Sequence, residues 1–534
     1  MPQLLLLGDE ALAQGALDAG ISGVYAYPGT PSTEITEYIQ ASSEAEERGV
    51  HRQWSANEKC AMEEALGMSY AGKRTLVCMK HVGLNVAADG FVNSAITGVH
   101  GGLIVAVADD PSMHSSQNEQ DSRFYAKFAG IPCLEPSNQQ EAYDMAFAGF
   151  EMSERLQIPV MMRLTTRLSH SRANISQQPL LPECGLSRPE DPSRFILLPA
   201  IARASYDKLL AKQSTFVAES ENSPFNAYLD GDDTSLGIVA TGIAFNYLME
   251  CFPAQDCPYP VLKLSQYPLP VKQLQKLIDT CDRVLLLEEG APFIEEMLHG
   301  PLALNEKVLG RMTGALPRTG ELNPDLVAKA LGIERPAVST GSPLLRVRPP
   351  RLCVGCPHIC SYNALLEVLK PHGRGHVFSD IGCYTLGALP PFNAIDTCID
   401  MGASVSAAKG AADAGIRPAV AVIGDSTFTH SGITPLLDAA WENTPMTVFI
   451  MDNETTGMTG GQDSSATGKI QQICTGLGVD PAHIRTFDPL PKQHDANVAI
   501  LREEIDFEGL SVVVAKRECI QTLRRKKRQP SRRN

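Results

Sequence analysis

The segment Ala419-Val-Ala-Val-Ile-Gly-Asp-Ser-Thr-Phe-Thr-His-Ser-Gly432 is followed along the chain by Thr447-Val-Phe-Ile-Met-Asp-Asn-Glu-Thr-Thr-Gly457. Each segment opens with an apolar run, and the runs stop at Gly424-Asp425 and Asp452-Asn453. Such runs predict two buried strands of a parallel sheet. Residues 432–443 have helical spacing, which predicts a strand–helix–strand unit with a right-handed crossover. Ligands of open α/β sheets bind at the carboxyl ends of strands, so this edge is the expected functional site.

Oxygen-bearing groups stand at these two strand ends. The Asp425 carboxylate, the Asn453 amide oxygen and the Thr455 carbonyl suit Mg²⁺, which prefers octahedral oxygen coordination and readily shares diphosphate oxygens. The pattern predicts a magnesium–diphosphate site, and the alternative is that Asp425 only caps the following helix. The same bend carries Gly424, which permits close approach of the diphosphate. The hydroxyl side chains of Ser426 and Thr427 are expected beside the same group.

Length and charge bound the class of protein. The 534 residues suit about three domains, and the net charge of −15 argues against a nucleic-acid binder. No apolar run approaches the roughly 20 residues that span a bilayer. The first strand-like run, Leu4–Leu7, leads into Gly8-Asp9-Glu10 rather than into a signal-peptide pattern. We therefore expect a cytoplasmic protein that binds neither membrane nor nucleic acid.

Two segments without clear periodicity, residues 172–199 and 338–350, are rich in Pro or Ser and are interpreted as linkers. The basic residues near the end of the sequence are interpreted as a solvated tail, with docking of an acidic partner as the alternative. The expected boundaries are residues 1–180, 200–335 and 345–520 for three α/β domains and 521–534 for the basic tail.

Fourteen cysteines in a cytoplasmic chain favour thiols or metal ligands over disulfides. Cys353 and Cys356 form a Cys-x-x-Cys pair, which is compatible with zinc, with a redox pair or with no site. Cys383 stands at a glycine turn. This third cysteine strengthens the case for a metal cluster.

These motifs in combination resemble a known family. Gly424-Asp425-Ser426 followed by Asn453 resembles the thiamine diphosphate motif, with Ser426 in place of its second glycine. Along essentially its whole length, the chain is similar to 2-oxoacid:ferredoxin oxidoreductases, and especially to indolepyruvate ferredoxin oxidoreductase alpha subunits. The resemblance implies an α/β thiamine diphosphate-binding fold. Two doubly wound parallel-sheet domains, of the pyrimidine and diphosphate types, are expected to flank a transketolase C-terminal-like domain.

The resemblance singles out one carboxylate for catalysis. Asn57-Glu-Lys-Cys-Ala-Met-Glu-Glu-Ala-Leu-Gly67 is similar to the family's catalytic segment and contains Glu58 at a predicted helix start. Thiamine chemistry needs a carboxylate that protonates the aminopyrimidine ring, so that the imino form can take the C2 proton. Glu58 is the expected residue, and Glu63 and Glu64 are expected on the helix surface. Without the resemblance, Glu58 is a helix-dipole partner.

Further substrate and cofactor contacts are implied by the same resemblance. Gly29, in a strand-to-helix turn, is expected beside the cofactor, and Thr30, which follows it, is expected to face the 2-oxo acid. His81, next to Lys80, is expected to contact substrate or intermediate. Arg123 matches the family's carboxylate-binding arginine and is expected to act as a bidentate clamp. The plainer readings are an ordinary turn, a structural histidine and a surface ion pair.

The cysteines also match the family. In pyruvate:ferredoxin oxidoreductases, Cys-Pro-Gly-Cys and Gly-Cys elements and a cysteine after the final strand hold the iron–sulfur cluster nearest the cofactor. The corresponding residues imply one 4Fe-4S cluster. Its expected ligands are Cys353, Cys356, Cys383 and Cys519, with Cys383 also beside the cofactor. The alternatives are replacement of one ligand by Cys360, Cys398 or Cys474, or a set of buried thiols without a cluster.

The resemblance implies oxidative decarboxylation of aryl 2-oxo acids, such as indolepyruvate, to acyl-coenzyme A with ferredoxin as electron acceptor. The implied partners are a small beta (gamma-type) oxidoreductase subunit and a separate ferredoxin, in a hetero-oligomer with dimerised alpha subunits. One departure is large: no ferredoxin-like pair of Cys-x-x-Cys-x-x-Cys runs occurs before Asn534. Electrons would then leave through another polypeptide, or the oxidative half of the chemistry is absent. The rivals are a non-oxidative thiamine-dependent decarboxylase and a non-enzymatic assembly subunit.

Overall fold

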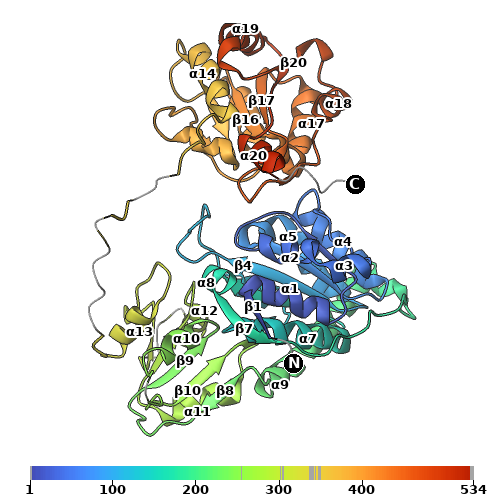
Figure 1. Ribbon diagram of the computed structural model, residues 1–534. Coiled ribbons are helices and arrows are strands. Elements are labelled where there is room, and N and C mark those ends of the chain that lie inside the picture. Colours follow the sequence, from blue (N-terminus) through green and yellow to red (C-terminus); the bar gives the residue numbers. More distant parts are fainter. Residues whose placement is uncertain are drawn as a thin grey trace. The chain divides into compact units, whose positions relative to one another are not determined.

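The chain forms two compact units, Met1–Ser339 and Thr340–Asn534 (Figure 1). The computed structural model describes residues 3–253, 255–300, 302, 306–335, 342, 344–346 and 350–528. Most of the expected second linker, residues 338–350, therefore lies outside the described residues.

Unit 1 begins with a six-stranded sheet in the order β11-β5-β6-β4-β3-β2. All neighbours are parallel except β11, which runs antiparallel to β5. The parallel strands are buried on both faces, which explains their almost continuous apolar sequences. The strands are β2 Gly23–Ala26, β3 Thr75–Lys80, β4 Leu103–Asp109, β5 Cys133–Leu134, β6 Val160–Thr165 and β11 Gln266–Tyr267.

Eight helices connect and cover these strands. Helix α1 packs against α7 and α2, and α4 packs against α5. Their bounds are α1 Gly8–Asp18, α2 Thr33–Ala41, α3 Ser43–Glu47, α4 Glu58–Tyr70, α5 His81–Thr97, α6 Arg123–Ala129, α7 Gln139–Leu156 and α8 Thr166–His170.

The first expected linker is partly ordered secondary structure. Its opening residues form β7 (Arg172–Ser176), which pairs antiparallel with β1 (Gln3–Leu7). Only Ile175 of β7 is buried, so the strand lacks the repeating apolar signal that marks a strand in sequence. A 3₁₀ turn, Pro192–Phe195, follows.

The second part of unit 1 is a five-stranded sheet in the order β13-β12-β9-β10-β8, with β8 antiparallel to β10. One short strand of this part of the sequence, β11, instead joins the N-terminal sheet. The strands are β8 Ala227–Leu229, β9 Gly237–Thr241, β10 Val261–Leu264, β12 Val284–Leu287 and β13 Val308–Leu309. The helices are α9 Pro199–Glu221, α10 Ala244–Met249, α11 Val271–Thr280, α12 Phe293–His299 and α13 Pro324–Ala330.

A buried charge network joins the two sheets of unit 1. The guanidinium of Arg163 on β6 donates to Asp109 at 2.6 Å and to Glu135 at 2.5 Å. It also donates to the carbonyl of Glu289, which follows β12, at 3.0 Å. Arg163 is fully buried. A buried charge is tolerated only when its partners replace water, so this network fixes how the sheets pack.

Unit 2 is a six-stranded sheet in the order β15-β14-β16-β17-β21-β20, with every pair parallel. Its strands are β14 Val377–Ser379, β15 Thr397–Cys398, β16 Val420–Gly424, β17 Met446–Asp452, β20 Ile484–Phe487 and β21 Leu510–Lys516. A small hairpin, β18 Thr455–Thr456 and β19 Gln462–Asp463, follows β17.

Helices cover both faces of this sheet. Alternate strand residues pack into one core with α14 and α19 and into another with α15, α17 and α18. Figure 1 shows α14 and α19 on one side of β16 and β17 and α17 and α18 on the other. The expected α/β fold with doubly wound parallel sheets is confirmed. The helices are α14 Pro357–Leu369, α15 Ala403–Asp413, α16 Asp425–Thr427, α17 Ile433–Glu442, α18 Ile470–Gly476, α19 His494–Ile505 and α20 Ile520–Arg528.

The basic tail contains ordered structure, because residues 520–528 form helix α20, while the side chains of residues 523–527 are exposed. The first four residues of this helix include the apolar Ile520 and Leu523, and Ile520 packs against Gly355. Residues 529–534 lie outside the described residues. Among the helices of the described chain, none combines the length and apolar character that a membrane span needs.

We expect the Arg163→Met substitution to lower the free energy of unfolding of unit 1 by about 3–5 kcal/mol, because it leaves buried carboxylates without their cation. The measurement is thermal unfolding followed by circular dichroism. Arg155→Ala is the matched control, since the Arg155–Glu219 pair is partly exposed and such pairs contribute about 0–1 kcal/mol. Equal losses in the two variants would contradict the structural role of Arg163.

Candidate functional site

The strand ends of unit 2 bring the expected metal ligands together. In the register of β16 and β17, Gly424 pairs with Met451. Asp425 and Asn453 therefore emerge side by side, and the Asn453 N–H points at Asp425 Oδ1 over 3.4 Å. One end of the Asn453 side-chain amide lies 2.7 Å from the Thr455 carbonyl oxygen and 3.1 Å from Asp425 Oδ1.

The side-chain amide of Asn453 can take two orientations at this corner, and each leaves the polar groups there with different partners. With the amide nitrogen of Asn453 turned inward, its N–H groups donate to the Thr455 carbonyl and to Asp425. With the amide oxygen turned inward, three oxygens converge with no proton between them, and a cation would balance them. Asp425 Oδ2 is also buried and has no hydrogen-bond partner among the described residues. The donor set therefore fits a hard divalent cation.

Burial has an electrostatic consequence at Asp425. Loss of hydration raises the pKa of its carboxyl to about 7, and the neighbouring Asp452 adds to this rise. No group of three or more His, Cys, Asp or Glu side chains within the described residues is arranged as a metal centre. The corner does not belong to that class, because it combines one carboxylate with an amide and a backbone carbonyl.

The residues around the corner are tightly packed. Ser426 Oγ lies 2.8 Å from Thr456 Oγ1, and Thr427 Oγ1 donates to the Ile381 carbonyl at 3.0 Å. A Cβ on Gly424 would lie 2.5 Å from Tyr384 Cε1. Glycine is therefore required at position 424 by packing against Tyr384, whatever approaches from the other side.

Sequence reasoning missed His358 at this corner. Its Nε2 lies 3.3 Å from Asn453 Nδ2, and burial lowers the pKa of the imidazole to about 4. A neutral imidazole can accept from the amide N–H of Asn453, which turns the amide oxygen toward Asp425. The only sequence signal was the position of His358 two residues after Cys356, at the start of α14.

A second missed residue is Asp380, which follows β14. Its carboxylate accepts from Ser404 Oγ at 2.5 Å and from the Gly402 N–H at 3.2 Å, and the Tyr384 hydroxyl also donates to it. Burial raises the pKa of Asp380 to about 7. These bonds fasten the loop that carries Cys383 to the start of α15.

The four expected cluster cysteines gather in unit 2. The Cys356 N–H donates to the Cys353 carbonyl at 2.9 Å, and the Cys519 N–H donates to the Asn453 carbonyl at 3.0 Å. Burial raises the pKa of the Cys356 thiol to about 11, and Cys353 and Cys519 raise it further. Burial likewise raises the pKa of Cys383 to about 12, again with contributions from the other three. The four cysteines therefore lie in one region of unit 2, although within the described residues their sulfurs do not form a metal centre.

The three alternative cysteines have other surroundings. Cys360 lies near Arg517 and Asp488. Cys398 donates to the Asp380 carbonyl at 3.7 Å, and Cys474 is buried in the apolar core beside α15 and α17. The choice of Cys353, Cys356, Cys383 and Cys519 over these three therefore stays a prediction.

In unit 1, Glu58 is the first residue of α4. The Asn57 side chain caps the helix by accepting from the Cys60 N–H at 2.8 Å. Glu58 is 5% exposed, and its carboxylate packs on Gly83 of α5, where a Cβ would lie 2.6 Å from Oε1. Glu63 and Glu64 lie on the helix surface, as expected. The chain thus holds one buried carboxylate at this helix start.

The turn at Thr30 is linked to Lys80. Ser115 Oγ donates to the Thr30 carbonyl at 3.3 Å, and Lys80 Nζ donates to the Ser115 carbonyl at 2.7 Å. A Cβ on Gly29 would lie 3.1 Å from Lys80 Cβ. Burial lowers the pKa of Lys80 to about 8. His81 Nε2 lies 3.3 Å from the Asn118 carbonyl, so the same loop reaches both residues.

Arg123 does not match the expected substrate clamp. Its guanidinium is fully buried and donates to Asp121 at 2.6 and 2.9 Å, to Glu288 at 3.0 Å and to the Tyr267 hydroxyl at 3.1 Å. The Ala291 carbonyl accepts a further bond at 3.0 Å. All five N–H groups of an arginine are occupied in this way. Arg123 instead belongs, with Arg163, to the buried charge network of unit 1.

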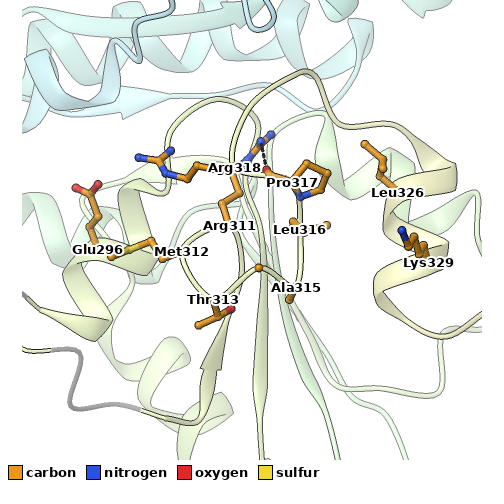
Figure 2. A pocket seen from close by; sticks show the side chains of 11 residues that line it. Glu296, Arg311, Met312, Thr313, Ala315, Leu316, Pro317, Arg318, Leu326 and Lys329 are labelled. Carbon is orange, nitrogen blue, oxygen red and sulfur yellow. Dashed lines mark hydrogen bonds between the residues drawn. The ribbon is translucent and has the colours of Figure 1, made fainter.

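A hollow of about 750 Å³ lies in the second part of unit 1 and is lined by residues of α12, α13 and the loop 311–318. Figure 2 shows the side chains that line it. Arg311, the most buried cation in its wall, donates to the carbonyls of Glu288, Pro317 and Gly320. The hollow contains none of the residues expected from the sequence to act in catalysis. Its size alone does not make it the functional site.

Two family models match the chain. The model described as "Pyruvate flavodoxin/ferredoxin oxidoreductase, thiamine diP-bdg" matches residues 14–194, which include Glu58. The model described as "Thiamine pyrophosphate enzyme, C-terminal TPP binding domain" matches residues 380–518, which include the strand-end corner.

Curated relatives extend the match to almost the whole chain. The indolepyruvate oxidoreductase subunit IorA of Archaeoglobus fulgidus is 39% identical over 97% of this chain and 86% of its own length. The chain belongs to the IorA family. The IorA subunit of Methanothermobacter thermautotrophicus is 38% identical, again over 97% of this chain and 87% of the relative. The resemblance inferred from the motifs is confirmed.

A solved structure supports the fold of this IorA-family chain. The 2-oxoglutarate:ferredoxin oxidoreductase from Magnetococcus marinus aligns with a TM-score of 0.51 at 15% identity, covering 62% of this chain and 65% of that chain. The IorA relatives and the two matched family models, rather than this structure, show that the chain is a 2-oxoacid oxidoreductase subunit with thiamine diphosphate-binding domains.

The contact between Glu58 and Gly83 predicts a sensitive position. In Gly83→Ala, the new Cβ would meet both Oε1 and Cγ of Glu58 within 2.7 Å, so the carboxylate must move. Because a displacement of about 1 Å can cost about 100-fold in rate, we expect thiamine-dependent turnover to fall by about that factor. The measurement is steady-state turnover, with circular dichroism to verify folding.

Gly67→Ala is the matched control for Gly83→Ala. Gly67 lies in α4 itself, and nothing lies within 4 Å of the added Cβ. This change should keep turnover and stabilise the helix by up to about 1 kcal/mol. Full activity of Gly83→Ala would contradict the positioning of Glu58 by α5.

Proposed function

We propose that this IorA-family chain catalyses the oxidative decarboxylation of aryl 2-oxo acids, such as indolepyruvate, on thiamine diphosphate. Coenzyme A is the proposed acyl acceptor and ferredoxin the electron acceptor. The observation that carries the proposal is the oxygen corner of Asp425, Asn453 and Thr455, which fits a cation bound to a diphosphate. The named activity of the IorA relatives supports the substrate class.

Unit 2 supplies the cofactor's anchor. Asp425, the Asn453 amide oxygen and the Thr455 carbonyl would hold Mg²⁺, and the cation would in turn hold the diphosphate. Ser426 and Thr427 stand at the same bend. When bound, thiamine diphosphate supplies a carbon nucleophile and a sink for the electron pair left by carbon dioxide.

Glu58 of unit 1 is the proposed acid–base group. Its buried carboxyl would exchange a proton with the aminopyrimidine ring nitrogen, and Gly83 and the start of α4 hold it in place. A neighbouring Asn57 cap fixes the helix terminus that presents it.

With Arg123 occupied, the substrate carboxylate needs another cation. Lys80 is our candidate, because its buried ammonium already reaches the Ser115 carbonyl beside the Thr30 turn. Thr30 and His81 would complete the polar contacts to the 2-oxo acid. Burial lowers the pKa of Lys80 to about 8, so it retains its charge below that pH.

The four cysteines Cys353, Cys356, Cys383 and Cys519 would hold one 4Fe-4S cluster, which would accept single electrons. A small subunit of the beta (gamma) type and a paired arrangement of alpha subunits complete the proposed assembly. A cluster on these cysteines would distinguish this proposal from a non-oxidative decarboxylase, for which no cluster is expected.

Replacing Glu58 tests the acid–base role. Glu58→Gln should reduce 2-oxo acid turnover by at least about 100-fold, because the amide cannot exchange the proton. Binding of thiamine diphosphate, measured by quenching of tryptophan fluorescence, should persist. Glu63→Gln, at an exposed position paired with Lys59, should leave both unchanged. Near-normal turnover in Glu58→Gln would remove Glu58 from the mechanism.

Replacing the cysteines tests the cluster. After anaerobic purification, the protein should contain about four iron atoms per chain and absorb visible light. Cys383→Ser and Cys519→Ser should lose most of this iron, whereas Cys398→Ser and Cys474→Ser should retain it. A colourless, iron-free wild-type protein that releases an aldehyde from the 2-oxo acid would favour the non-oxidative decarboxylase.

A further inference from the structure

Helix α20 is strongly basic, although the protein as a whole is acidic. It reads Ile-Gln-Thr-Leu-Arg-Arg-Lys-Lys-Arg over Ile520–Arg528 and contains no acidic residue. The chain as a whole carries a net charge of −15. The side chains of residues 524–527 are all exposed. A concentrated positive field on an acidic protein attracts acidic partners by long-range steering.

Few of these cations are neutralised by the protein. Lys526 pairs with Glu518, and Arg525 donates to the Gly460 carbonyl. Arg524 and Lys527 form no ion pair or hydrogen bond within the described chain. Both are therefore available to a partner.

The helix lies beside the cysteine set. It begins directly after Cys519, whose N–H donates to the Asn453 carbonyl. Ile520 Cδ1 approaches within 3.1 Å of the position that a Cβ on Gly355 would take, so the first turn rests on the turn between Cys353 and Cys356. At the other side, Arg525 and Thr522 pack on Gly461 of the β18–β19 hairpin. Both anchors fix the basic side chains close to the cysteines.

Exposed apolar side chains accompany the charges. Val354, between Cys353 and Gly355, is 83% exposed, and Leu523 of α20 is 37% exposed. Leu523 also lines a hollow of about 550 Å³ together with Phe487 and Arg517. Small contacts of a few apolar groups within a charged surround are typical of transient electron-transfer complexes.

We propose that the exposed cations of α20, together with Val354, dock a small acidic electron-carrier protein of the ferredoxin type. This inference rests on the proposed function and adds the surface where electrons leave. Each carrier accepts one electron. The balanced reaction consumes one 2-oxo acid, one coenzyme A thiol and two oxidised carriers. It releases one acyl thioester, one carbon dioxide, one proton and two reduced carriers.

The test uses the complete holoenzyme with its small subunit and a variant that carries R524Q, R525Q, K526Q and K527Q. Glutamine keeps the helix while removing four charges. The control variant removes four exposed cations of unit 1 instead, R188Q, R203Q, K208Q and K272Q. The assays are reduction of an acidic ferredoxin and reduction of methyl viologen, a small acceptor that needs no docking surface.

The α20 variant should lose at least about tenfold in kcat/KM for ferredoxin at low salt, while methyl viologen reduction stays unchanged. The loss should vanish in about 1 M salt, where charges are screened within about 3 Å. The kcat at saturating ferredoxin should persist, because docking and not the electron transfer itself is weakened. The unit 1 variant should behave as wild type.

Other results overturn the inference. Unchanged ferredoxin kcat/KM in an α20 variant that still reduces viologen overturns docking at this helix and leaves the proposed function standing. Equal losses with both acceptors place the defect before electron exit and also overturn it. If the substitutions abolish binding to phosphatidylglycerol vesicles or duplex RNA but spare ferredoxin reduction, the face serves a lipid or nucleic acid. A wild-type holoenzyme that reduces neither acceptor overturns the proposed function together with this inference.

Discussion

The parallel alignment of β16 and β17 is the constraint on which the proposed chemistry depends. It places Asp425 and Asn453 at one edge, each at the point where an apolar strand gives way to polar backbone. The fold thereby concentrates a carboxylate, an amide and a carbonyl in a buried corner, with Asp425 Oδ2 unpaired within the described residues. Such a corner is costly without a counter-charge. Under the proposed function, a divalent cation bound to a diphosphate would supply this counter-charge.

In unit 1, by contrast, the buried arginines form ion pairs with carboxylates of the protein itself. Arg123 and Arg163 are surrounded by carboxylates from both sheets, and the five N–H groups of the Arg123 side chain are all occupied. Removal of hydration raises the pKa of Glu288 to about 7 and that of Glu289 to about 8. The role of the network is therefore structural: it holds the two sheets of unit 1 together. The catalytic expectation shifts to groups with fewer internal partners, Lys80 among them.

Much of unit 2 was predictable from sequence, because apolar runs that end in Gly-Asp and Asp-Asn determine both strand direction and the side on which ligands gather. The expected cysteine set came from family resemblance and stays a prediction, since spacing alone would not have selected Cys519 over Cys474. The partners of Arg123 were not predictable, since Glu288 lies far along the chain and only packing brings it near.

His358 was missed because its role depends on the side-chain orientation of Asn453. Helix α20 was missed because a run of cations resembles a solvated tail.

Strand β11 gives unit 1 an unusual connectivity. Gln266 and Tyr267 belong by sequence to the second sheet, but they close the edge of the first one beside β5. An N-terminal piece cut off before residue 266 would expose the backbone of Cys133 and Leu134 as a free sheet edge and would also lose the Tyr267 hydroxyl that faces Arg123. Free edges invite pairing with other chains. The two halves of unit 1 are therefore interlocked, and separating them would convert a buried seam into a surface prone to aggregation.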